Sequence, residues 1–81
     1  MKTIKYFSAT WCGPCKSFKP VMNEIASEGY SVQFIDIDQS PSTATQYNVM
    51  SVPTVIIEEN GSEVDRFVGS MPKQMVLERL S

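Results

Sequence analysis

The chain has 81 residues, of which 42% are hydrophobic, and its formal net charge is −2. This is the size of one domain, residues 1–81, and the chain has too many apolar side chains to be disordered. Its seven basic residues are scattered along the sequence, so they form no basic cluster of the kind that binds nucleic acid. No apolar run approaches the ~20 residues of a membrane span, and the N-terminal segment lacks the apolar region of a signal peptide, so we expect a cytoplasmic protein away from the membrane.

The first half of the chain predicts a strand, a helix and a second strand. Residues 2–8 carry a short apolar pattern that is typical of a strand. Residues 12–28 predict an amphipathic helix, because apolar side chains recur along one face: Phe18, Val21, Met22 and Ile25. Residues 31–38 predict a second strand. Two strands joined by a helix form a right-handed unit in which the strands are parallel.

The second half predicts a helix, a hairpin and a last helix. A short helix is expected over residues 41–47, with Ser40 as its N-cap. Strands over residues 54–57 and 63–68 flank Asn60-Gly61, a dipeptide typical of tight hairpin turns. The last helix presents three apolar side chains to the core: Val76, Leu77 and Leu80. The order β-α-β-α-β-β-α predicts an α/β fold with a four-stranded mixed sheet and three helices.

Both cysteines lie in Trp11-Cys12-Gly13-Pro14-Cys15, where the first predicted strand runs into the first helix. Two thiols at this spacing form a dithiol/disulfide couple. Cys12 is expected at the first exposed turn, where free N–H groups and the helix dipole favour a thiolate, and is the predicted nucleophile. Cys15 lies one turn further in and is the predicted resolving thiol. Gly13 lets a partner's backbone approach, and Pro14 suits the first helical turn.

A structural or metal-binding role for the cysteine pair is less well supported. A structural disulfide that closes so short a loop would stabilise the fold by about 2 kcal/mol at best. A metal site would lack ligands, because the chain has no histidine and no further cysteine. Chance spacing leaves the surrounding Trp, Gly and Pro unexplained, and a reducing cytosol favours a catalytic pair over a structural one. We therefore predict a redox-active pair and no metal.

The chain resembles the thioredoxin family over essentially its whole length. The resemblance rests on several motifs in the family's order: Trp11-Cys12-Gly13-Pro14-Cys15-Lys16, Pro20, Ile37-Asp38-Gln39, Val52-Pro53-Thr54, Asn60-Gly61 and Val68-Gly69. It implies a thioredoxin-like fold and a monomeric protein dithiol–disulfide oxidoreductase that reduces protein disulfides. It also implies disulfide-containing proteins as partners, no bound cofactor, and electrons from NADPH through a thioredoxin reductase.

The resemblance further implies a groove for the substrate. In the family, the residue matching Pro53 is a cis proline packed against the disulfide, and the residue matching Val52 pairs with the substrate through its backbone. Sequence alone favours a trans bond by about twenty to one, so the cis bond follows only from the resemblance. The remaining groove residues implied by the family are Trp11, Gly13, Pro14, Gly69 and Ser70.

Further residues are expected around this groove. The resemblance implies that Asp38 accepts the indole N–H of Trp11, and Lys16 belongs to the same motif as a supporting residue. Met50 and Met71 are candidates for the rim, because methionine adapts to varied partners. Packing in the core would account for both methionines equally well.

Two features depart from the family. The chain resembles a short thioredoxin without the usual N-terminal strand and helix, so the second predicted strand becomes an edge of the sheet. Most thioredoxins also bury an aspartate and a lysine where this chain has Tyr6 and Phe34, whose rings are expected to pack together. Neither ring can accept a proton from Cys15, so we expect water or the departing thiolate to take it. Asp36, on the same strand face as Phe34, is a remote second candidate, and we favour a solvated edge position for it.

Three other functions remain open. The short length would suit a glutaredoxin-type redoxin, but Gly13 stands where that group has proline, and no Gly-Gly pair follows the last strand. A small redoxin dedicated to ribonucleotide reductase is possible on size alone. A thioredoxin-like subunit of a larger assembly would use the same apolar rim without redox chemistry.

Overall fold

The computed structural model describes residues 2–81 and contains the predicted elements in the predicted order. The strands are β1 (Lys2–Ser8), β2 (Ser31–Asp36), β3 (Thr54–Glu59) and β4 (Ser62–Val68). The helices are α1 (Gly13–Ser27), α2 (Pro41–Gln46) and α3 (Lys73–Leu80). None of these helices is long and apolar enough to cross a bilayer.

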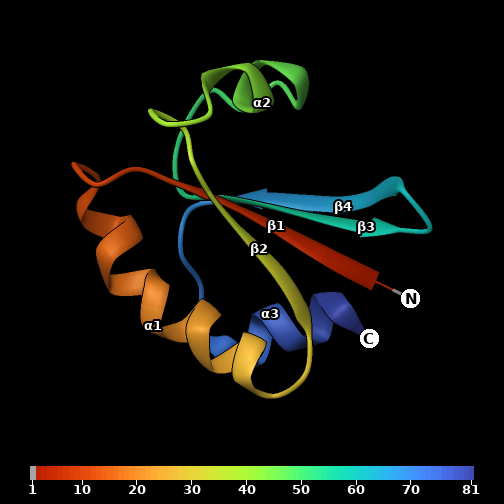
Figure 1. Cartoon of the computed structure of the whole chain (residues 1–81). Helices are drawn as coiled ribbons and strands as arrows, with labels where there is room; N and C mark the ends of the chain where they lie inside the picture. The colour runs from red at the N-terminus through yellow and green to blue at the C-terminus, as the bar shows by residue number, and fades with distance from the viewer. Residues whose placement is uncertain (1) are drawn as a thin grey trace.

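The four strands form one mixed sheet in the order β2-β1-β3-β4 (Figure 1). β1 pairs in parallel with β2, and β3 runs antiparallel to both β1 and β4. The parallel pair and the hairpin agree with the prediction, and β2 lies at an edge of the sheet, as expected. Asn60 and Gly61 form the hairpin turn with positive φ angles of 55° and 85°, the conformation that this dipeptide favours.

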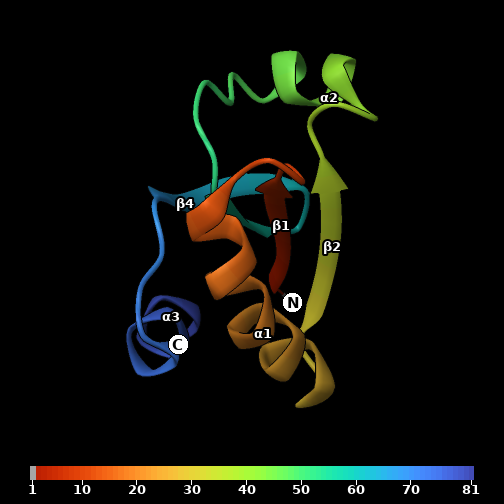
Figure 2. The ribbon, with the colours of Figure 1, turned by 90° about the vertical axis from the view of Figure 1, so that its left-hand side faces the viewer.

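Helices α1 and α3 cover one face of the sheet, and α2 lies over one end of the other face (Figures 1 and 2). The main core fills the space between the sheet and the helix pair. Its largest fully buried members alternate along β1 and β3 or recur along α1: Ile4, Tyr6, Val55, Ile57, Phe18, Met22 and Ile25. The predicted helical stripe is therefore confirmed, and burial of these side chains is the main force that holds α1 against the sheet.

Two strands differ from the prediction by two residues: β3 extends to Glu59, beyond its expected end, and β2 is shorter for a local reason. β2 ends at Asp36, two residues early, because the Asp36 carboxylate accepts the backbone N–H of Asp38 at 2.8 Å and turns the chain out of the sheet. Ser40 precedes α2 as expected, but its side chain makes no capping hydrogen bond. The last helix begins at Lys73, and Val76 and Leu80 are buried with Leu77 packed beside them, as predicted.

The face of the sheet under α2 carries an ion pair in addition to an apolar cluster. Lys5 on β1 and Glu58 on β3 meet at 2.6 Å, with side chains 18% and 9% exposed, and the Lys5 ammonium lies 5.5 Å from the centre of the Tyr47 ring. The hydrogen bond that Lys5 donates to the Glu58 carboxylate raises the pKa of Lys5 above its ordinary value of 10.5, although burial opposes this rise. Because the folded-state pKa is the higher one, this stabilisation is complete below pH 10.5 and is lost as pH rises through the folded pKa.

Replacement of Glu58 tests this pair. Glu58→Gln is expected to lower the free energy of unfolding at neutral pH by about 1–3 kcal/mol, because the largely buried ammonium loses its charged partner. The variant should also lose stability less steeply than the parent as pH rises above 10.5. Urea unfolding at a series of pH values measures both effects.

The matched control is Glu63→Gln, which removes the carboxylate from a more exposed pair with Arg66. Its side chains are 37% and 33% exposed, so a loss of at most about 0.5 kcal/mol is expected. Equal losses in the two variants would contradict a special contribution from the buried pair.

Candidate active site

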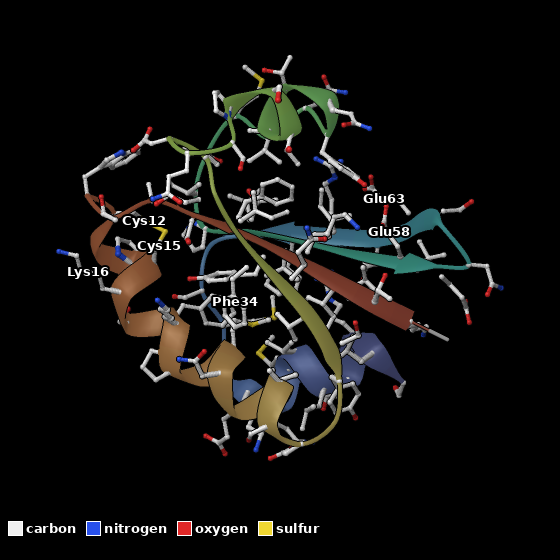
Figure 3. All side chains as sticks on the ribbon, in the orientation of Figure 1. Cys12, Cys15, Lys16, Phe34, Glu58 and Glu63 are labelled. Carbon is white, nitrogen blue, oxygen red and sulfur yellow. A yellow bond between two sulfur atoms is a disulfide. The ribbon has the colours of Figure 1, made fainter. Side chains whose placement is uncertain are left out.

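The two cysteines lie at the junction between β1 and α1, at the end of the sheet where α1 begins (Figure 3). They form a disulfide in this structure, with their Cα atoms 5.3 Å apart. Cys12 is the N-cap of α1 and Cys15 lies in the first turn, so both sulfur positions are set by how β1 delivers the chain to the helix.

The exposure of Cys12 differs from the expectation. Sequence reasoning placed Cys12 at an exposed turn, but the residue is only 5% exposed, against 2% for Cys15. The reason is tertiary, because Val52 closes over the disulfide and its carbonyl oxygen lies 3.7 Å from Cys12 Sγ. Cys12 Sγ therefore lies directly beside the backbone of Val52.

Cys12 Sγ lies at the start of α1, where it accepts a backbone hydrogen bond. The backbone N–H of Cys15 donates a hydrogen bond to this sulfur at 3.2 Å. The sulfur thus takes the place of the side-chain oxygen that accepts this bond at an ordinary N-cap. The first turn of α1 holds no acidic residue, and Pro14 occupies an early position where no N–H is needed. Unpaired N–H groups and the helix dipole can therefore stabilise negative charge on Cys12 Sγ.

The Val52–Pro53 bond is cis, as the family resemblance implies. Pro53 is buried, and its carbonyl oxygen accepts the backbone N–H of Gly69 at 2.8 Å. This bond ties the segment after β4 to the start of β3, beside the disulfide. Three stretches distant in sequence thus converge on one place, and Val52 packs against the cluster of Ala9 and the two cysteines.

The residues expected around the groove differ in how exposed they are. Trp11 is largely exposed and donates its indole N–H to Asp38 at 2.8 Å, which confirms the expected hydrogen bond. Met50 is 96% exposed and so does not fill the core, whereas Met71 packs against the main core. The remaining expected residues of the motif and groove are half-buried or exposed: Gly13, Pro14, Lys16, Gly69 and Ser70.

A recess of about 340 Å³ lies behind Cys15, and sequence reasoning did not find it. Its walls come from the end of β1, the first two turns of α1 and the end of β2. They include Cys15, Lys16, Lys19, Phe34, Asp36 and Gln39. The recess opens to solvent, and Cys15, which is 2% exposed, forms part of its wall. Phe34 and Asp36 lie two residues apart and share one face of β2, as expected from the sequence, and both line this recess.

The packing of Tyr6 against Phe34 is confirmed, with ring centroids 5.7 Å apart and ring planes at 86°. Tyr6 is fully buried, and its hydroxyl donates to the carbonyl oxygen of Cys15 at 3.0 Å. Sequence reasoning missed this hydrogen bond. The signal was available, since a tyrosine placed in a core must find a partner for its hydroxyl. Burial also raises the pKa of Tyr6 above its ordinary value of 10.0.

Comparison with known proteins gives a consistent result. The thioredoxin family model matches residues 2–81. A thioredoxin of Staphylococcus aureus is 48% identical over 77 residues, which cover 91% of this chain and 74% of that protein. Among solved structures, a mutant thioredoxin from Halobacterium salinarum NRC-1 superposes with a TM-score of 0.91 at 30% identity, over 96% of this chain and 70% of its own. A Fasciola hepatica thioredoxin gives a TM-score of 0.90 at 32% identity, over 98% of this chain and 77% of its own.

The hydrogen bond between Trp11 and Asp38 yields a test, because Trp11 is the one tryptophan in the chain. Asp38→Ala is expected to free the exposed indole ring and lower its fluorescence anisotropy, with a change of at most about 1 kcal/mol in the free energy of unfolding. The control is Asp65→Ala, which removes an acid that pairs with Arg79 instead. Unchanged anisotropy in Asp38→Ala would mean that this hydrogen bond does not hold the ring.

Proposed function

The chain belongs to the thioredoxin family and is a thiol–disulfide oxidoreductase, and on this premise we propose that it reduces disulfides in other proteins through Cys12 and Cys15. The observation that carries the proposal is the position of Cys12 Sγ. This sulfur accepts an N–H at the start of α1 and lies against the carbonyl of Val52. A disulfide with a purely structural role would need neither this hydrogen bond nor this contact.

In the first step, the Cys12 thiolate attacks one sulfur of a bound protein disulfide. A bond forms between Cys12 Sγ and that sulfur, the substrate disulfide breaks, and the second substrate sulfur leaves as a thiolate. The N–H groups at the start of α1 support this role, because they favour the charged form of Cys12 at neutral pH.

The substrate is proposed to bind along the groove beside the disulfide. Val52 would pair with an extended substrate segment through its backbone, and Gly13 would allow that segment to come close. Exposed Trp11 and Met50 offer apolar area at the rim, which suits a site for varied partners. The other residues proposed to line the groove are Pro14, Pro53, Gly69 and Ser70, with Asp38 and Lys16 in supporting positions.

In the second step, Cys15 attacks Cys12 Sγ. The bond between the two cysteines forms, the mixed disulfide breaks, and the substrate leaves reduced. Cys15 must lose a proton first, and we assign this proton to the departing thiolate or to water in the recess behind Cys15. Asp36 also lines the recess, but its Oδ1 already accepts the backbone N–H groups of Asp38 and Gln39, at 2.8 and 3.3 Å.

Electrons are proposed to come from NADPH through a thioredoxin reductase. This cycle needs a reducing compartment, and on that ground we place the protein in the cytoplasm. By the family resemblance we also propose that it is a monomer. A glutaredoxin-type cycle would instead draw its electrons from glutathione, and the two donors can be separated directly.

The test of the function uses the oxidised protein and an insulin-type protein disulfide. Reduction by NADPH and thioredoxin reductase, and not by glutathione alone, is expected, and the reduced protein should then cleave the substrate disulfide. The double variant Cys12→Ser, Cys15→Ser should lose all activity. Reduction by glutathione alone would contradict the proposed donor, and full activity in the double variant would contradict the mechanism.

A second prediction concerns the proton acceptor. Asp36→Asn is expected to leave the pH dependence of disulfide reduction unchanged, because solvent and the leaving thiolate take the proton of Cys15. The pH profile of single-turnover reduction measures this. A loss of rate that occurs only in this variant would identify Asp36 as the base.

A further inference from the structure

The Tyr6 phenol is held in one orientation and directed at Cys15. The ring is fully buried in the main core. It meets the Phe18 ring at 5.8 Å and 79° and the Phe34 ring at 5.7 Å and 86°, both edge-on. Its hydroxyl reaches the carbonyl oxygen of Cys15 at 3.0 Å. A ring confined on two sides cannot turn away easily, so the hydrogen bond is a lasting connection between β1 and the first turn of α1.

Tyr6 cannot act as a base for Cys15. The phenol carries one proton, which it already donates to the Cys15 carbonyl. Burial raises its pKa further, so the phenol stays neutral at physiological pH. A neutral phenol does not take a proton from a thiol. The contribution of Tyr6 must therefore come from donation of a hydrogen bond.

A donor at this carbonyl affects the sulfur of the same residue. The carbonyl oxygen carries partial negative charge close to the Cys15 side chain, and this charge opposes formation of the thiolate. A hydrogen bond to the oxygen offsets part of that charge, and it does so more strongly in a buried site than in water. The same bond also keeps the first turn of α1 at its present position when the disulfide is open. This favours the short distance that attack on Cys12 requires.

We propose that Tyr6 is a positioning residue for the resolving step, acting on Cys15 through its backbone carbonyl, while the proton of Cys15 passes to water or to the departing thiolate. The inference rests on the thiol–disulfide exchange proposed above. In that step the S–H bond of Cys15 breaks and its proton passes to water or to the departing thiolate. The Cys12–Cys15 bond forms, and the electron pair of the mixed disulfide leaves on the substrate sulfur. Tyr6 gives up no proton and changes no redox state.

The test follows the two steps separately. Reduced protein is mixed with a symmetric nitrobenzoate disulfide, whose released thiolate absorbs visible light. The first release reports attack by Cys12, and its rate depends on reagent concentration. The second release reports attack by Cys15, and its rate does not. In Tyr6→Phe the first rate is expected to stay within about twofold of the parent, and the second to fall about fivefold at neutral pH. The midpoint of the pH profile of the second release should move upward.

The matched control is Tyr47→Phe, which removes a phenol hydroxyl on the other face of the sheet, where its ring packs against Phe7. Its second release is expected to match the parent. An unchanged second rate and pH midpoint in Tyr6→Phe would overturn the inference, as would equal slowing in the control. A parent protein with no second release would instead overturn the proposed exchange itself.

A further variant applies if Tyr6→Phe does not fold. Phe34→Leu removes one of the two rings that hold Tyr6 but leaves the hydroxyl in place. It is expected to slow the second release in the same direction by a smaller factor, of about twofold. Urea unfolding verifies that each variant is folded, and a second release equal to that of the parent in folded Phe34→Leu would overturn the inference.

Discussion

The start of α1 is the constraint on which the site depends. The first backbone N–H groups of any helix lack partners within the helix, and here one of them finds the sulfur of Cys12 at 3.2 Å. This bond needs Cys12 at the N-cap, where β1 delivers it, and α1 pressed against the sheet by its buried side chains. The cis turn at Val52 and Pro53 then covers the sulfur and leaves a backbone carbonyl beside it. Core packing thereby sets the surroundings of Cys12 Sγ, on which the proposed reactivity depends.

Most members of the family have a buried carboxylate that can accept the proton of the resolving cysteine. In this chain, we propose that several features behind Cys15 share this task. Tyr6 supplies a hydrogen-bond donor, and the proposed mechanism passes the proton of Cys15 to water in the recess beside Phe34 and Asp36 or to the departing thiolate. An aromatic interior avoids the cost of burying a charge, which an unpaired carboxylate would incur. The arrangement makes access of solvent to Cys15 part of the proposed chemistry, so the shape of the recess matters as much as the identity of any one residue in it.

The other face of the sheet shows how a small fold stabilises a surface that α2 covers only at one end. The apolar cluster of Phe7, Ile35 and Ile56 lies where α2 reaches. Beyond it, Lys5 and Glu58 carry charges that cross from β1 to β3. Along the same strands, apolar side chains are therefore buried where α2 covers the sheet, and a charged pair lies where α2 does not reach.

The sequence by itself determined the order of the elements, the hairpin and the helical position of the cysteine pair, because each depends on neighbours within about ten residues. It could not determine what lies across the sheet. The cis bond before Pro53 came only from the family resemblance, and burial of Cys12 under Val52 contradicted the expectation from its position in the helix. The bond from Tyr6 to Cys15 and the recess were also decided by tertiary structure. Each of these features depends on which distant segments meet and in what register, and local spacing does not carry that information.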